Sequence, residues 1–129
     1  MNSGDSVIGS ELRSRIREFS ETGDGTYETT LLFDPAFRGF EGHFPDRPIV
    51  PGVCLAELAR VFAEVVLKRK LRCVGIRQCR FRRPVEAGDE VRCRLRRTGC
   101  EGNTSEWSAD ISVVEGGTAC QMRMLLEES

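Results

Sequence analysis

The sequence predicts an α+β domain in which a curved antiparallel sheet wraps around one long central helix. The first observation is a run of good helix formers at residues 53–71, which contains no proline or glycine. This run is also apolar on nearly every side, so it needs to be enclosed rather than covered on one face. The third observation is a series of later segments in which apolar and polar residues alternate, as in strands with one buried face. This combination is typical of a sheet packed around a helix.

The length, composition and charge suit a single globular domain. The chain has 129 residues, of which 40% are hydrophobic and 30% are charged. We expect a loose tail at residues 1–9 and one domain at residues 10–129. Nineteen basic and twenty acidic side chains give a net charge of −1. This balance argues against binding to nucleic acid or to an anionic membrane.

The N-terminal part of the domain predicts a hairpin. Residues 10–21 are ambiguous, because Leu12, Ile16 and Phe19 have helical spacing, yet residues 16–19 also suit a short edge strand. We expect the strand. Residues 22–25 read as a turn, and residues 26–33 are rich in β-branched and aromatic side chains that favour the second strand.

The segment before the long helix contains the only histidine, His43. Three prolines between His43 and Gly52 fix the backbone and remove N–H donors, which predicts a stiff, extended loop. A helix is expected at residues 52–71, with Pro51 and Gly52 at its start. Basic residues at 68–70 would complement the negative end of the helix dipole.

Four strands are predicted after the helix, at residues 73–81, 90–98, 106–114 and 118–126. Their inward faces are expected to carry Val91, Cys93 and Leu95; Trp107, Ala109, Ile111 and Val113; and Cys120, Met122, Met124 and Leu126.

The six cysteines include no CxxC pair, and residues 1–14 do not resemble a secretory leader. We therefore expect reduced, mostly buried thiols in a cytoplasmic protein, and no zinc site. The longest apolar run, residues 53–67, is interrupted by Glu57, Arg60 and Glu64, so it is not expected to span a bilayer.

His43 and Glu57 are the candidates for chemistry, each with a plainer alternative. A single histidine in a loop is more often a surface residue, but His43 precedes a helix N-terminus, where free N–H groups could stabilise an oxyanion. Glu57 could belong to a solvated stripe with Arg60 and Glu64, or it could be a buried carboxyl with a raised pKa. Cys54 is expected to be a packing thiol rather than a nucleophile.

Residues 77–97 contain eight arginines and three acidic residues. This cluster is either the solvated face of two strands or a docking surface for an acidic partner.

A specific pattern surrounds the histidine: Gly42-His43-Phe44-Pro45, Pro48, Pro51-Gly52-Val53 and Glu57. It resembles the active-site signature of the β-hydroxyacyl-[acyl-carrier-protein] dehydratases, which have the hot-dog fold. In that family also, the glycine falls nine residues and the glutamate fourteen residues after the histidine. Residues 80–89 resemble the family's strand after the helix and the turn that follows it.

The resemblance implies a homodimer, or a higher assembly of dimers, with active sites at the subunit boundary. Each site would pair His43 of one chain with Glu57 of the other. The implied substrate is a 3-hydroxyacyl thioester on the phosphopantetheine arm of acyl carrier protein, and the products are the trans-2-enoyl thioester and water. Arg80, Arg82 and Arg83 are the expected docking residues for the carrier protein.

The resemblance also implies a role for each site residue. His43 would remove the α-proton, the backbone N–H of Gly52 would hold the thioester oxygen, and Glu57 would protonate the leaving β-oxygen. Phe44 and Val53 would line the acyl tunnel. No metal or organic cofactor is implied.

Two departures from the family pattern indicate a specialised relative, serving a lipid or secondary-metabolite pathway. Val61 stands where the family usually has a glutamine, and Ala87 stands where a proline is common. Two alternatives remain: a non-catalytic hot-dog subunit that binds acyl chains, and a hot-dog thioesterase.

Overall fold

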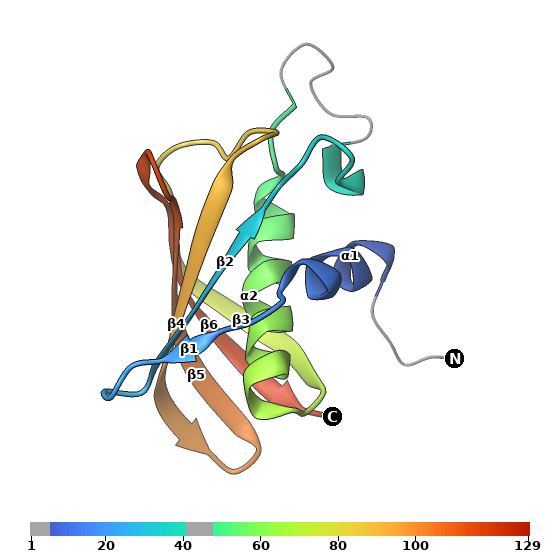
Figure 1. The fold of residues 1–129 in the computed structure, drawn as a ribbon. Coiled ribbons are helices and arrows are strands. Elements are labelled where there is room, and N and C mark those ends of the chain that lie inside the picture. Colours follow the sequence, from blue (N-terminus) through green and yellow to red (C-terminus); the bar gives the residue numbers. More distant parts are fainter. Residues whose placement is uncertain (1–5, 41–47) are drawn as a thin grey trace.

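The computed structural model describes residues 6–40 and 48–129. Figure 1 shows the order of the elements along the chain. They are α1 (Val7–Arg15), β1 (Ser20–Glu21), β2 (Thr26–Leu32), the 3₁₀ helix η1 (Arg38–Phe40), α2 (Gly52–Leu67), β3 (Leu71–Phe81), β4 (Glu90–Glu101), β5 (Thr104–Val113) and β6 (Gly117–Glu128).

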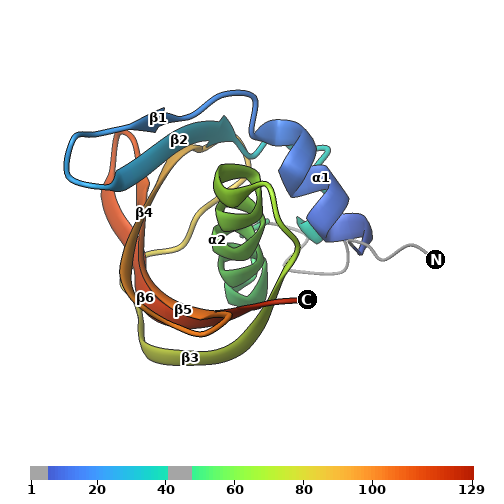
Figure 2. The same cartoon turned by 90° about the horizontal axis from the view of Figure 1, so that it is seen from below.

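The described strands form one sheet in the order β1-β2-β4-β5-β6-β3, and every neighbouring pair is antiparallel. Figure 2, seen nearly along the axis of α2, shows the sheet curving around that helix while α1 lies on the side that the sheet leaves open. The predicted α+β arrangement is therefore confirmed. β3 is an edge strand of this sheet, because β6 is its one neighbour among the described strands.

The alternating pattern buries the side chains that the sequence predicts. In β5, the side chains of Trp107, Ala109, Ile111 and Val113 all face the core. The register continues this inner layer across the sheet, since Ile111 pairs with both Cys93 and Cys120. Trp107 is fully buried, and its indole Nε1–H donates a hydrogen bond of 2.8 Å to Ser105 Oγ.

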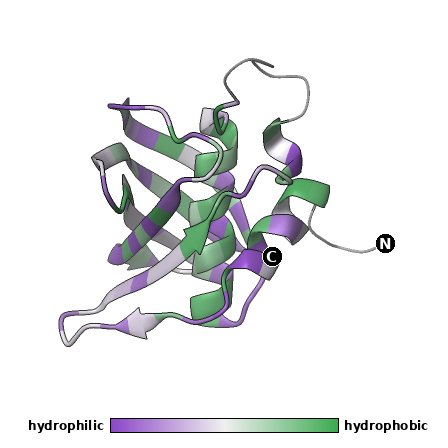
Figure 3. Cartoon of the chain, turned by 45° about the horizontal axis from the view of Figure 1, so that its top comes forward, coloured by the Kyte–Doolittle hydropathy of each residue, from purple (hydrophilic) through white to green (hydrophobic). Residues whose placement is uncertain are grey.

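α2 is enclosed on almost all sides, and Val53 is the one exposed residue within its bounds. Figure 3 shows hydrophobic residues, in green, along this helix, and green and purple residues alternating along the strands around it. The helix ends at Leu67, four residues earlier than predicted, because Lys68 adopts a left-handed conformation and Leu71 is buried at the start of β3. The basic residues 68–70 therefore follow the helix and do not lie in its last turn as predicted.

The N-terminal segment also differs from the prediction. The short edge strand expected at residues 16–19 is wrong, because these residues form no strand and β1 begins only at Ser20. Residues 7–15 form α1, which also takes residues 7–9 from the expected tail. Ser6 Oγ caps this helix by accepting a hydrogen bond of 3.1 Å from the N–H of Gly9. Leu12 is fully buried, and α1 packs against α2, so tertiary burial favours the helical spacing. The predicted hairpin is confirmed in a shorter form, with β1 limited to Ser20–Glu21.

Candidate active site

The entry to α2 is fixed to the segment that follows β3. The N–H of Val50 donates to the carbonyl of Val85 over 2.7 Å, and the N–H of Ala87 donates to the carbonyl of Pro48 over 3.3 Å. Ile49 and Glu86 form an isolated antiparallel bridge between these bonds. The start of α2 is thereby held against the turn that precedes β4.

The N-terminus of α2 offers backbone N–H groups without a side-chain cap. Pro51 occupies the cap position, and its side chain makes no capping hydrogen bond. The first N–H of the helix to bond back to Pro51 is that of Cys54, over 2.9 Å, so the N–H groups of Gly52 and Val53 precede the intrahelical bonds. Such groups, at the positive end of the helix dipole, can hold a carbonyl oxygen that gains negative charge.

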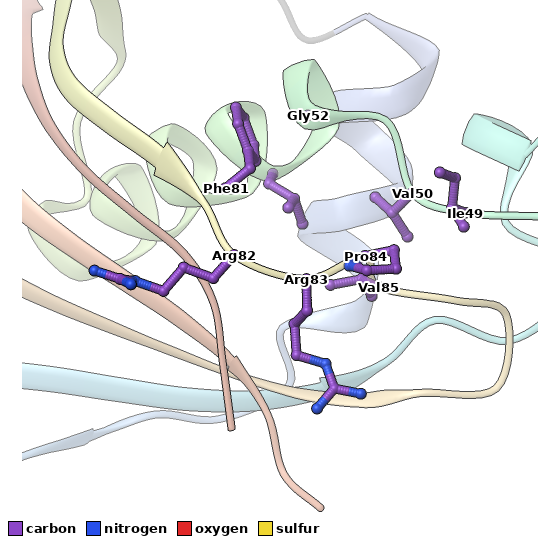
Figure 4. Close-up of a pocket in the computed structure, with 9 residues that line it drawn as sticks. Ile49, Val50, Gly52, Phe81, Arg82, Arg83, Pro84 and Val85 are labelled. Carbon is purple, nitrogen blue, oxygen red and sulfur yellow. The ribbon is translucent and has the colours of Figure 1, made fainter. Parts of the chain in front are cut away.

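A pocket of about 410 Å³ lies beside this helix start. Figure 4 shows Phe81 next to Gly52, with Pro84 and Val85 on the adjoining segment. A Cβ atom at position 52 would lie 2.7 Å and 2.9 Å from two ring carbons of Phe81, so glycine permits their close approach. The lining is mostly apolar and consists of Ile49, Val50, Gly52, Leu55, Phe81, Arg82, Arg83, Pro84 and Val85.

Val53 does not line this pocket, and its side chain is 76% exposed. Its predicted role in the acyl tunnel stays a prediction. His43 and Phe44 lie outside the described residues, so their predicted roles also remain predictions.

Glu57 is part of an ion pair within α2. Both of its carboxylate oxygens accept hydrogen bonds from Arg60, Oε1 from Nε over 3.0 Å and Oε2 from Nη2 over 2.6 Å. The side chains are 27% exposed for Glu57 and 14% exposed for Arg60. The pairing three residues apart is confirmed, but the stripe is partly enclosed rather than fully solvated.

The ion pair extends to Glu64, which the sequence placed on the same helical stripe. The side chain of Glu64 is only 6% exposed, and its Oε2 accepts hydrogen bonds from Arg60 Nη1 and from the N–H of Leu71, at 2.8 Å and 2.7 Å. Arg13 of α1 binds the other oxygen. The sequence analysis did not identify Arg13 and Leu71 as partners of Glu64, because both lie outside α2 and are brought to it by the tertiary fold.

Cys54 is buried near Glu57, as expected for a packing thiol. Burial raises the pKa of Cys54 above its ordinary value, and the charge of Glu57 raises it further. Burial also raises the pKa of Cys93, and it raises that of Cys120 to about 12. These thiols are therefore poor nucleophiles at neutral pH, because the reactive thiolate is scarce.

The rate of alkylation should distinguish these buried thiols from an exposed one. In native protein at pH 8, we expect iodoacetamide to modify exposed Cys100 while Cys54, Cys93 and Cys120 stay unmodified, because each pKa unit lowers the thiolate fraction about tenfold. Peptide mass spectrometry over a time course measures this order, and urea-unfolded protein, in which every thiol should react, is the control. Equal rates at Cys54 and Cys100 in native protein would contradict the packing role.

The three arginines of the expected docking surface are exposed at the end of β3 and just after it. Arg82 Nε donates to Gln121 Oε1 over 3.2 Å, and Arg83 donates to the carbonyl of Gly116. Both contacts are with neutral groups, so the positive charges are not neutralised by these partners. Arg92 and Arg94 of the same cluster instead pair with Glu28 of β2.

Within residues 6–40 and 48–129, no three His, Cys, Asp or Glu side chains lie close enough together to hold a metal ion. No helix in this part of the chain is both long and apolar enough to cross a membrane.

The sequence matches a protein-family model described as ApeI-like, ApeI dehydratase, over residues 19–121. The 3-hydroxyacyl-[acyl-carrier-protein] dehydratase FabZ of Bacillus cereus (strain AH820) is 39% identical over 89 residues, which cover 64% of this chain and 61% of that protein. The FabZ protein of Bacillus pumilus is 37% identical over 92 residues, covering 66% and 63%. The chain therefore matches a little over three fifths of the length of these curated relatives.

Solved structures with low sequence identity share the fold. The dehydratase heterocomplex ApeI:P from Xenorhabdus doucetiae has a TM-score of 0.69 at 20% identity, covering 87% of this chain and 96% of that chain. The E. coli PaaI protein of the phenylacetic acid degradation operon has a TM-score of 0.67 at 15% identity, covering 92% and 88%. The expected hot-dog fold is thereby confirmed.

Proposed function

Because the chain belongs to the ApeI-like dehydratase family, we propose that it removes water from a 3-hydroxyacyl-[acyl-carrier-protein] thioester to give the trans-2-enoyl thioester. The family match over residues 19–121 carries this proposal. The FabZ proteins that it resembles are named for the same reaction. The uncapped N-terminus of α2 beside an apolar pocket supports the proposal, since a thioester carbonyl and an acyl chain require those two features.

The reaction begins with proton abstraction from the α-carbon of the substrate. An α-proton beside a thioester is a weak acid, so a base must lie on it while donors hold the carbonyl oxygen. His43 is the base, and the N–H of Gly52 holds the oxygen as negative charge develops there. The missing Cβ of Gly52 lets the ring of Phe81 pack against the helix start, while Phe44 and Val53 line the path of the acyl chain.

Elimination is completed when the bond between the β-carbon and its oxygen breaks. The electron pair of the broken C–H bond forms the double bond, and the hydroxyl leaves as water after receiving a proton from Glu57. Glu57 becomes a carboxylate in this step, and the proton held by His43 restores its acid form for the next turnover. These residues use no metal or organic cofactor.

The active protein is a homodimer or an assembly of dimers, with each site shared by two chains. An exposed edge strand carries unpaired backbone groups and readily pairs with another strand. β3 is such an edge, and three exposed apolar side chains lie on it: Val74, Ile76 and Phe81. Pairing of two β3 strands would cover these residues and join two sheets.

Carrier-protein docking is assigned to Arg80, Arg82 and Arg83. Charge reversal to glutamate at any of these positions should raise KM about 5- to 50-fold for a carrier-protein substrate and leave KM for a pantetheine substrate unchanged. Steady-state kinetics with both substrates, at two salt concentrations, measures the difference. Arg94→Glu is the matched control, because Arg94 already pairs with Glu28 on the sheet surface. Equal effects on both substrates would remove the docking assignment.

The function itself is tested by following two products together. The protein is incubated with a 3-hydroxyacyl carrier protein or its pantetheine analogue, and enoyl absorbance and free thiol are recorded. We expect enoyl product without thiol release. Thiol release would show a thioesterase, and absence of both products would leave the acyl-binding role.

A further inference from the structure

We infer that Arg60 is a positioning residue for the acid step: its guanidinium orients the carboxyl of Glu57 and stabilises the carboxylate that remains after proton donation. The inference rests on the proposed function, because it assigns the proton donor of that reaction to Glu57. It adds a residue that has no role in the motif around His43.

The guanidinium of Arg60 makes two sets of contacts. One set, the fixed end, is to Glu64 and Leu71, and the other, the functional end, is to Glu57. Nη1 donates to Glu64 Oε2 over 2.8 Å and to the carbonyl of Leu71 over 3.0 Å. Nε and Nη2 point the other way along the helix and bind the two oxygens of Glu57. The guanidinium is planar and rigid, so holding Nη1 also fixes the direction in which Nε and Nη2 present their protons.

The fixed end is itself held by groups outside α2. Glu64 is buried and receives the N–H of Leu71 at the start of β3, and Arg13 of α1 binds its other oxygen. Three elements therefore set the position of Arg60. A side chain fixed in this way loses little conformational entropy when it holds Glu57 in one geometry.

Polar support for Glu57 does not come from the next turn of the helix. Val61, four residues after Glu57, is apolar and fully buried in the core. Arg60 lies beside it, on the stripe that stays partly exposed, and supplies two charge-assisted hydrogen bonds. Without these two bonds, the partly exposed carboxyl of Glu57 would be free to change rotamer.

The contact between Arg60 and Glu57 can assist the acid step of the reaction. When the carboxyl of Glu57 transfers its proton to the departing β-hydroxyl, the C–O bond breaks, water forms and a negative charge appears on Glu57. A guanidinium already aimed at both oxygens receives that charge without reorganising. The contact is therefore stronger after proton transfer than before it, so it stabilises the carboxylate that the acid step produces once Glu57 carries the proton delivered from His43.

The test compares Arg60→Met and Arg60→Lys with wild-type protein, using a 3-hydroxyacyl-pantetheine substrate. Methionine keeps an unbranched stem but removes the charge, while lysine keeps the charge and loses the two-pronged geometry. We expect kcat to fall about 100-fold for Arg60→Met and about tenfold for Arg60→Lys. KM should stay within about threefold of the wild-type value in both variants, because the contact does not touch the ground-state substrate.

Arg94→Met is the matched control. Arg94 also donates two hydrogen bonds to a carboxylate, that of Glu28, at 3.0 Å and 2.8 Å, but on the sheet surface away from the candidate site. Its kcat should equal that of wild type, and circular dichroism with thermal unfolding should confirm that all variants are folded at the assay temperature.

A folded Arg60→Met protein with kcat within about threefold of wild type overturns the inference. If Arg60→Met does not fold, an unchanged kcat in Arg60→Lys overturns it, because lysine retains the charge opposite buried Glu64. If the wild-type protein forms no enoyl product, the proposed function is overturned, whatever the variants do.

Discussion

Mixing two inactive variants, His43→Ala and Glu57→Gln, should restore about a quarter of the wild-type activity, although each variant alone loses turnover by about 10⁴-fold or more. The reason is that the proposed site is shared by two chains. In a mixed dimer, His43 from the glutamine variant meets Glu57 from the alanine variant, and the second site lacks both groups. Random exchange at equal amounts makes about half of the dimers mixed, each with one intact site of two.

Subunit exchange has to be shown independently for this result to be decisive. Affinity tags of two kinds, one on each variant, allow mixed dimers to be isolated and their enoyl product to be measured. Mixed dimers without activity would mean that His43 and Glu57 do not act in one site across a boundary. Full activity of either variant alone would remove that residue from the chemistry.

The second large effect is expected at the β3 edge, where Ile76→Asp should convert the proposed dimer into monomers and reduce activity at least 100-fold. Ile76 is 44% exposed on an edge strand, and a carboxylate there would have to lose its hydration when two edges pair. Loss of the boundary also separates His43 from the partner's Glu57. Sedimentation velocity and the enoyl assay on the same preparation measure both effects.

Leu32→Asp provides the matched control for this prediction. Leu32 is 49% exposed, but it lies on β2, away from the β3 edge. This variant should keep the wild-type sedimentation coefficient and activity. A dimeric, active Ile76→Asp protein would show that β3 does not form the subunit boundary.

The strands were the most predictable part of the fold. β4 at its start, β5 and much of β6 bury alternate side chains, so the sequence shows the period directly, and β5 follows it without interruption. β3 buries only Leu71. The order of these strands in the sheet could not be read in the same way. β3 comes first of the four in the chain and yet pairs with β6, because the register depends on contacts between distant residues.

The two helix errors have one physical cause. At α1, the helical spacing of Leu12 and Ile16 competed with a strand at residues 16–19, and burial of Leu12 against α2 favoured the helix, which ends at Arg15. At the end of α2, the helix formers at 68–70 could have continued the helix. The left-handed Lys68 and the burial of Leu71 in the sheet ended it. Local preference is weaker than either tertiary contact.

For the site, the residue types and their spacing could be read from the sequence. The start of α2 at Gly52 agrees with the predicted helix start. The pairing of Glu57 with Arg60 followed from their separation of three residues. The support behind Arg60 did not, because it comes from α1 and β3, which are 47 and 11 residues away in the chain. Such long-range partners leave no periodic signal in one sequence.

The hydrogen bonds between residues 48–50 and 85–87 join the segment before α2 to the segment after β3. Arg83 is two residues before Val85, whose carbonyl holds the N–H of Val50, and Val50 is two residues before the first residue of α2. Arg83 and Gly52 are therefore separated by one hydrogen bond and a few peptide units. If a carrier protein docks at these arginines as proposed, it contacts the backbone segment that is hydrogen-bonded to the proposed thioester site, and docking would then be coupled to catalysis.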